Sequence, residues 1–200
     1  KSLHVAMGVA TLTFPWLFES SLAVIIVSIL SAIYLSLIER VKFFQQTLGK
    51  VVAGVERKSY GTVFFAVAVA SVFVMSEGDP LLYCVPIGIL TFGDSLAALI
   101  GRYYGTTKIE TGEGAKSWEG SIAMFIVAFI VSLFGMYLWR GGHAISSFHQ
   151  VLIALMLGMV SMLVEAISWK GLDNLFLPIL GYLFLGTYLQ LSEADLIVRL

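Results

Sequence analysis

The chain has 200 residues, of which 58% are hydrophobic and only 12% are charged. Soluble domains carry about 25% charged residues, so this composition excludes an ordinary soluble protein and favours a membrane protein, because lipid accepts apolar side chains. The net charge of −1 gives no sign of a nucleic-acid partner, and we expect none. The single cysteine, Cys84, cannot form an intrachain disulfide.

Seven apolar runs follow one another along the chain, and each is a candidate membrane-spanning helix. A spanning helix needs about 20 apolar residues, and two of the runs, the first and the third, are short for that length. The sequence predicts an all-α, polytopic transmembrane helical bundle with about seven spanning helices, forming a single membrane-embedded domain over residues 1–200. The runs are Val5–Phe18, Leu22–Ile38, Thr62–Ser76, Leu81–Ile100, Ser121–Trp139, Ala144–Ile167 and Leu175–Leu191.

Basic residues are distributed unevenly between the two sides of this predicted bundle. Because cytoplasmic loops are enriched in lysine and arginine, the side that carries most of them is expected to face the cytoplasm. Only Arg140 and Arg199 fall on the opposite side. The cytoplasmic set is Lys1, Arg40, Lys42, Lys50, Arg57, Lys58, Arg102, Lys108, Lys116 and Lys170.

Four acidic residues lie at ends of predicted helices on this cytoplasmic side. Asp94 and Glu165 come near the ends of the fourth and sixth runs, while Glu119 and Asp173 precede the fifth and seventh. Ionisable residues inside membrane segments are costly and are candidates for function. An alternative is that these carboxylates only stabilise helix ends, as acidic residues do at N-termini.

The segment between the fourth and fifth runs is rich in glycine and lysine. Glycine lets backbone N–H groups approach an anion closely, and Arg102, Lys108 and Lys116 supply positive charge. Ser117 can cap the next helix, whose N-terminus itself favours anions. The segment therefore indicates a phosphate site, although a solvated loop would have a similar composition, and it contains no Walker A motif. Its glycines are Gly101, Gly105, Gly112, Gly114 and Gly120.

Three further candidates belong to the same side of the bundle. His4 lies one turn into the first helix, and Arg57 and Lys58 precede the third. The histidine could equally be a hydrogen-bonded packing residue, and the two basic residues could be anchors at the membrane surface.

Five sequence motifs, taken together and in this order, resemble the CTP-dependent lipid-alcohol kinases: dolichol kinase, phytol kinase and yeast-type diacylglycerol kinase. The resemblance extends from Lys1 to about Pro178. The third and fourth motifs are also similar to those of phosphatidate cytidylyltransferases, but the His-Gly-Gly segment and the paired aspartates of those enzymes are missing. The motifs are Lys1-x-x-His4-x-x-x-Gly8, Arg57-Lys58-x-Tyr60-Gly61-Thr62, Gly93-Asp94-Ser95-x-Ala97-Ala98-x-x-Gly101-Arg102, Lys116-Ser117-Trp118-Glu119-Gly120-Ser121 and Glu165-Ala166-x-Ser168-x-x-Gly171-x-Asp173-Asn174-x-x-x-Pro178.

The resemblance implies phosphoryl transfer from CTP, with Mg²⁺, to the hydroxyl of a long-chain lipid alcohol at the cytoplasmic face of the membrane. It implies metal ligands at Asp94, Glu119 and Asp173, and catalytic residues at Asp94, Glu165 and Lys116. Asp94 is the first choice as general base. The residues expected to bind the nucleotide are His4, Arg57, Lys58, Arg102, Lys108, Lys116, Ser117, Gly120 and Asn174.

Other functions stay open at this point. A phosphatidate cytidylyltransferase that makes CDP-diacylglycerol from CTP is the main alternative enzyme. A transporter would be expected to carry acidic residues at mid-bilayer depth and inverted repeats, and we find neither. A purely structural membrane subunit is a further alternative. The expected partners are the lipid alcohol, CTP and membrane lipids, and a second copy of the chain in a homo-oligomer is left open.

Overall fold

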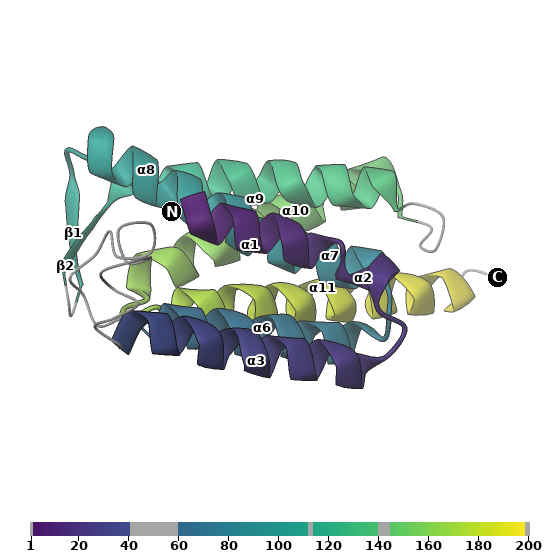
Figure 1. Ribbon diagram of the computed structural model, residues 1–200. Coiled ribbons are helices and arrows are strands. Elements are labelled where there is room, and N and C mark those ends of the chain that lie inside the picture. Colours follow the sequence, from purple (N-terminus) through teal and green to yellow (C-terminus); the bar gives the residue numbers. More distant parts are fainter. Residues whose placement is uncertain (1, 41–59, 112–113, 140–144, 199–200) are drawn as a thin grey trace.

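The computed structural model describes residues 2–40, 60–111, 114–139 and 145–198, and the chain forms a bundle of helices over these ranges (Figure 1). The described residues of the seven apolar runs are mainly helical, although the first run is divided between two helices at Thr13. The elements are α1 (Ser2–Leu12), α2 (Phe14–Leu17), α3 (Ser21–Arg40), α6 (Gly61–Ser76), α7 (Pro80–Gly88), the π-helix η1 (Ile89–Asp94), α8 (Ser95–Tyr103), β1 (Lys108–Thr111), β2 (Gly114–Ser117), α9 (Trp118–Leu138), α10 (Ser147–Ile167) and α11 (Asp173–Val198).

Three helices among the described residues are long and apolar enough to cross a membrane, namely Pro80–Tyr103, Trp118–Leu138 and Ser147–Ile167. The first combines α7, η1 and α8 into one continuous helix. Shorter apolar helices cover Leu3–Leu12, Ser21–Leu37 and Gly61–Ser76. The structure thus agrees with a helical membrane protein, and the number of seven crossings stays a prediction.

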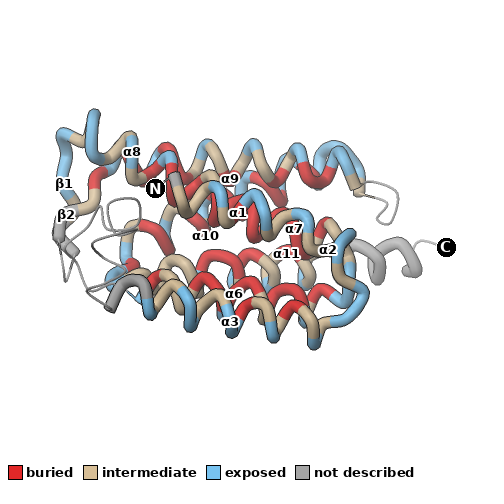
Figure 2. The backbone as a smooth tube through the Cα atoms, viewed as in Figure 1, coloured by how far each residue is buried: buried red, intermediate tan, exposed pale blue. Residues whose placement is uncertain are grey.

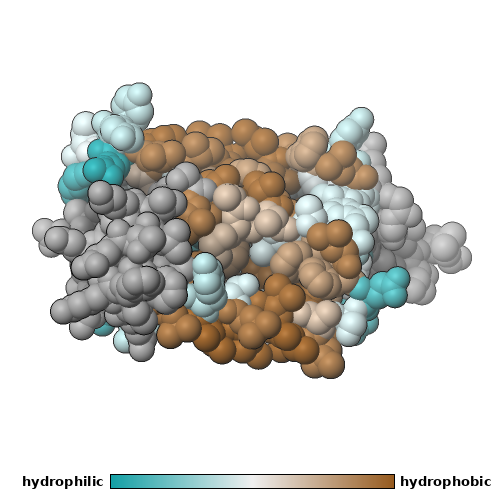
Figure 3. All heavy atoms as spheres, viewed as in Figure 1, coloured by the Kyte–Doolittle hydropathy of each residue, from teal (hydrophilic) through white to brown (hydrophobic). Residues whose placement is uncertain are grey.

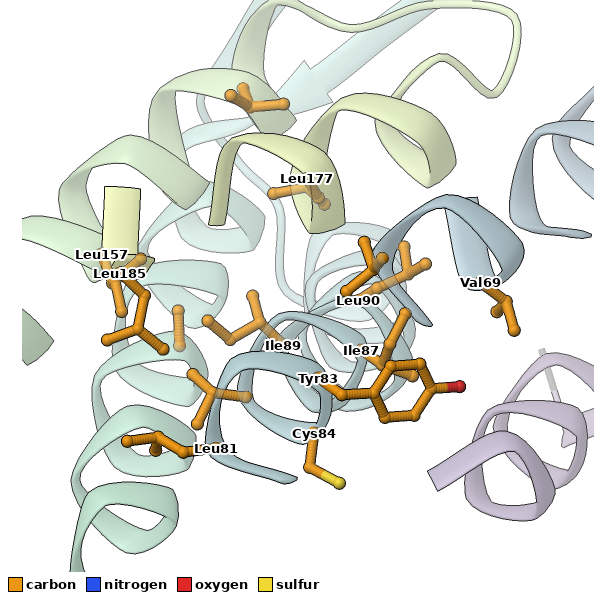
Figure 4. Packing of buried hydrophobic residues seen from close by; sticks show 14 of the residues in the cluster. Val69, Leu81, Tyr83, Cys84, Ile87, Ile89, Leu90, Leu157, Leu177 and Leu185 are labelled. Carbon is orange, nitrogen blue, oxygen red and sulfur yellow. The ribbon is translucent and has the colours of Figure 1, made fainter. Parts of the chain in front are cut away.

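The apolar side chains divide into an inner and an outer set. Leu81, Ile87 and Leu90 of the continuous helix Pro80–Tyr103, called the central helix below, are at most 1% exposed and pack within the bundle (Figures 2 and 4). Large apolar residues such as Ile130 and Phe134 are instead more than half exposed. Figure 3 shows hydrophobic residues mainly over the middle of the visible face and hydrophilic ones towards its two ends. This distribution suits a bundle whose outer surface lies in lipid.

The central helix begins sharply and changes its hydrogen-bonding pattern halfway. The carboxylate of Asp79 accepts hydrogen bonds from the backbone N–H groups of Leu81 and Leu82, at 2.7 and 3.1 Å, and Pro80 occupies the first turn. Pro86 has no N–H to donate, and the helix continues as the π-helix η1. Asp94, the last residue of η1, is only 6% exposed.

Helix α1 lies directly against this π-helix. Gly8 is buried at the crossing, where a Cβ atom would overlap the side chain of Thr91. The hydroxyl of Thr91 donates a hydrogen bond to the carbonyl oxygen of Ile87 at 2.7 Å. A larger residue at position 8 would therefore push α1 away from the segment that carries Asp94.

The loop before α9 contains a β-hairpin, which is an exception to the predicted all-α fold. Strands β1 and β2 pair antiparallel, with Lys108 opposite Ser117 and Ile109 opposite Lys116. The hairpin lies at the end of the bundle where α8 ends and α9 begins (Figure 1). Because side chains alternate between the two faces of a strand, Lys116 and Ser117 point in opposite directions.

Candidate functional site: a carboxylate cluster at one end of the bundle

Three acidic side chains from three helices meet at the end of the bundle near the hairpin. Asp94 ends η1, Glu165 lies in the last turn of α10, and Asp173 begins α11. One carboxylate oxygen of each lies within 4.8 Å of the corresponding oxygens of the other two. Asp94 and Glu165 are buried, and Asp173 is partly buried. The predicted convergence of these three residues is therefore seen in the structure.

A tight turn between α10 and α11 brings two of these carboxylates together. Lys170 and Gly171 both have positive φ, at 56° and 82°, in the left-handed region that glycine adopts readily. The backbone N–H of Leu172 donates to the carbonyl of Trp169 at 3.0 Å. The chain reverses within these few residues, so Asp173 begins α11 beside Glu165 at the end of α10.

Lys116 is the cation of this cluster. Its Nζ atom lies 2.9 Å from Oε1 of Glu165 and 3.4 Å from Oδ2 of Asp173, and it also donates to the backbone carbonyl of Glu165. The lysine reaches these groups from β2, which lies far from both in the sequence. Three oxygen atoms of the cluster thus surround one ammonium group.

Among the described residues, the cluster holds more acidic than basic side chains. Three carboxylates face Lys116 and, at Asp94, His4, and Oε2 of Glu165 is buried with no hydrogen-bond partner among those residues. Carboxylates gathered at low dielectric repel one another and need positive charge nearby. Mg²⁺ takes oxygen ligands and is commonly held by carboxylates together with phosphates. The donor set therefore fits a divalent cation.

His4 contacts the cluster from helix α1. Its Nε2 atom lies 3.5 Å from Oδ2 of Asp94, and its ring packs edge-on against Phe65 of α6, with the ring centroids 5.3 Å apart. His4 thus packs against a neighbouring ring, as considered from the sequence, and also contacts the candidate site residue Asp94. The structure places His4 beside Asp94, at the predicted site.

Asn174 connects the cluster to helix α6. Its side-chain amide donates to the carbonyl oxygen of Gly61 at 3.0 Å, and its backbone N–H donates to Oδ1 of Asp173 at 3.0 Å. Its side chain thus holds the start of α11 against the start of α6, while its backbone orients Asp173. A direct role of Asn174 in nucleotide binding stays a prediction.

Glu119 lies outside the group of three carboxylates. Its Oε1 atom accepts hydrogen bonds from the backbone N–H groups of Thr106 and Thr107, at 2.9 and 3.2 Å, and from the hydroxyl of Thr106. Glu165, which we expected as a catalytic residue, lies in the cluster with Asp94 and Asp173, and a metal-binding role for Glu119 stays a prediction. Neither threonine was singled out in the sequence, because nothing in the local pattern shows which backbone groups the Glu119 carboxylate reaches.

The other expected nucleotide-binding residues occupy different positions. Ser117 is buried and caps α9 by accepting from the backbone N–H of Gly120 at 3.2 Å. Gly120 packs closely against α8, where an added Cβ would come within 2.8 Å of the carbonyl oxygen of Ala97. Arg102 and Lys108 are exposed at the same end of the bundle. Two residues, Arg57 and Lys58, lie outside the described residues.

Comparison with known proteins identifies relatives of one kind. A phytol kinase of Synechocystis is 31% identical over 142 residues, which cover 69% of this chain and 59% of the relative. Phytol kinase 1 of Arabidopsis thaliana, a chloroplastic protein, is 28% identical over 60% of this chain and 40% of its own length. The chain is a homologue of the phytol kinases and belongs to the lipid-alcohol kinase family. The resemblance inferred from the five motifs is thereby confirmed at the level of the family.

The extent of this similarity limits what the relatives imply. The chain spans 59% of the length of the cyanobacterial phytol kinase and 40% of the length of the Arabidopsis one. A third relative, a probable phytol kinase 1 of Oryza sativa, is 38% identical over 34% of this chain and 21% of its own length. No protein-family model and no solved structure matches the chain. The relatives do not support the cytidylyltransferase alternative.

Proposed function

We propose that this chain is a lipid-alcohol kinase of the phytol-kinase type, which transfers a phosphoryl group from CTP to a long-chain isoprenoid alcohol. The observation that carries the proposal is the cluster of Asp94, Glu165 and Asp173 with Lys116 at one end of an apolar helical bundle. Phosphoryl transfer depends mainly on positioning and on charge stabilisation. The cluster offers both at the end of helices whose outer surface is apolar.

The three carboxylates of the cluster would hold Mg²⁺, which neutralises phosphate charge when bound. Lys116 already lies among these carboxylates and would pair with phosphate oxygens of the donor. Arg102 and Lys108 are exposed nearby and would add positive charge for the triphosphate. Two further residues, Arg57 and Lys58, are proposed for the same purpose from their motif alone.

In the proposed reaction the hydroxyl oxygen of the lipid alcohol forms a bond to the γ-phosphorus of CTP. The bond from that phosphorus to the bridging oxygen breaks, and CDP leaves with the electron pair. Asp94 is the proposed acceptor of the hydroxyl proton, because it is a buried carboxylate at the cluster. His4, 3.5 Å from Asp94, would help to fix the orientation of that carboxylate.

The sequence and the fold together support a proposal for the membrane setting of the reaction. Among the described basic residues, Arg102, Lys108, Lys116 and Lys170 lie at the end of the bundle that holds the cluster. The positive-inside rule favours a cytoplasmic position for this end. We therefore propose a multi-pass protein with about seven crossings, in which the apolar chain of the substrate lies among the helices and its hydroxyl reaches the cytoplasmic face.

A product assay tests this function. Protein in detergent micelles is incubated with Mg²⁺, CTP and either phytol, another polyprenol, dolichol, diacylglycerol or phosphatidate. We expect CDP and a phosphorylated isoprenoid alcohol, with phytol among the best acceptors. Release of pyrophosphate with phosphatidate, and no CDP with any alcohol, would contradict the proposed function.

A further inference from the structure

The hairpin that carries Lys116 is held at its base by one carboxylate. The ladder between β1 and β2 ends with Lys108 opposite Ser117, and the backbone N–H of Trp118 continues it by donating to Thr107 at 3.0 Å. Glu119, in the first turn of α9, directs its side chain back across this base. Its Oε1 atom accepts hydrogen bonds from the backbone N–H groups of Thr106 and Thr107, which precede β1, and from the hydroxyl of Thr106.

On strand β2, the side chain of Ser117 lies on the face opposite to Lys116 and is closely packed. An added Cβ atom at Gly105 would lie 2.6 Å from the hydroxyl oxygen of Ser117, and one at Gly101 would lie 2.9 Å from it. The two glycines therefore leave the space that the serine side chain fills. Because side chains alternate along β2, fixing Ser117 against α8 directs Lys116 away from α8. That direction leads to Glu165 and Asp173.

We infer that Glu119 is a positioning residue, which pins the β-hairpin so that Lys116 reaches the carboxylate cluster. This inference rests on the proposed function and changes the role expected from the sequence, in which Glu119 was a metal ligand. One oxygen atom that accepts three hydrogen bonds from Thr106 and Thr107 holds the start of β1 in place. Glu119 thus acts on the reaction through Lys116.

Two substitutions at one position separate anchoring from metal binding. Glu119→Gln keeps one carbonyl oxygen that can accept from Thr106 and Thr107, but it removes the negative charge that a metal ligand supplies. Glu119→Ala removes the acceptor altogether. We expect Glu119→Gln to retain kcat within about threefold of the wild type, and Glu119→Ala to raise the KM for the nucleotide at least about tenfold. The Mg²⁺ concentration for half-maximal activity should stay unchanged in Glu119→Gln.

Thr106→Val provides a second, milder variant that removes only the hydroxyl donor. Its effect on the nucleotide KM should be smaller than that of Glu119→Ala. In the double variant Thr106→Val with Glu119→Ala, the valine should add nothing further, because the acceptor is already gone.

Limited trypsin digestion of the detergent-solubilised protein measures how firmly the hairpin is held, and it does not depend on kinase activity. Lys108 and Lys116 are cleavage sites within the hairpin. Cleavage at these sites should be at least several-fold faster in Glu119→Ala than in the wild type and nearly unchanged in Glu119→Gln. If the wild type had no kinase activity, the proposed function would fail, and this digestion alone would still decide the role of Glu119.

Two results would overturn the inference. One is a Glu119→Gln variant as inactive as Asp94→Asn, with hairpin cleavage like the wild type, since this is the behaviour of a metal ligand. The other is a Glu119→Ala variant whose hairpin is cleaved no faster than that of the wild type.

Discussion

Asp94→Asn is expected to lower kcat by about 10²–10³-fold or more while leaving the helical bundle folded in detergent. The amide that replaces the carboxylate has a similar shape, so the packing of Asp94 against its neighbours changes little. The charge that would hold the cation and accept the hydroxyl proton is lost, and the loss of one such electrostatic group has an effect of this size. The rate of CDP release with saturating alcohol measures the change.

A matched control lies in the same continuous helix. Asp79→Asn makes the same chemical change at the opposite end, where asparagine caps a helix as well as aspartate does. We expect this control to keep both its activity and its thermal stability. If Asp94→Asn were also as active as the wild type, Asp94 would have no part in the reaction.

Lys116→Met is expected to make the stability of the protein depend on a divalent cation. The lysine is the described partner of two largely buried carboxylates, Glu165 and Asp173. Removing one partner of a buried ion pair costs about 3 kcal/mol. We expect a loss of this size in the free energy of unfolding in the presence of EDTA, and partial recovery when Mg²⁺ is added, because a ligand that binds only the folded state stabilises it.

Lys108→Met is the matched control for this measurement. Lys108 lies in the same hairpin but is exposed, so its replacement should change the stability by no more than about 0.5 kcal/mol with or without Mg²⁺. Equal stability of Lys116→Met and the wild type in EDTA would show that the lysine does not balance the charge of the cluster.

The sequence predicts the helices and the side on which the site lies. Apolar runs separated by polar segments are a strong signal, and the described residues of each run are mainly helical. Successive spanning helices run in opposite directions, and this alternation decides which helix ends lie on the same side. The placement of Asp94, Glu165 and Asp173 at one end of the bundle could therefore be predicted from the order of the helices. The number of crossings could not be settled in this way, because α1 and α6 are shorter than the usual span.

The finer geometry of the site could not be read from the sequence. The segment from Lys108 to Ser117 has no clear alternation of apolar and polar residues, so its pairing as a hairpin was not predicted. Without the hairpin, the direction of the Glu119 side chain could not be predicted, and the metal-ligand role expected for it came from the resemblance to the lipid-alcohol kinases. The π-helix that ends at Asp94 likewise has no local signature apart from Pro86.

Binding of Mn²⁺, a paramagnetic substitute for Mg²⁺, tests most directly whether the carboxylate cluster is a cation site. Electron paramagnetic resonance of the detergent-solubilised protein gives the fraction of Mn²⁺ bound at each concentration. We expect one site in the wild type, competition by Mg²⁺, and affinity at least about tenfold weaker in both Asp94→Asn and Asp173→Asn. Wild-type affinity in both variants would contradict a cation site formed by these carboxylates.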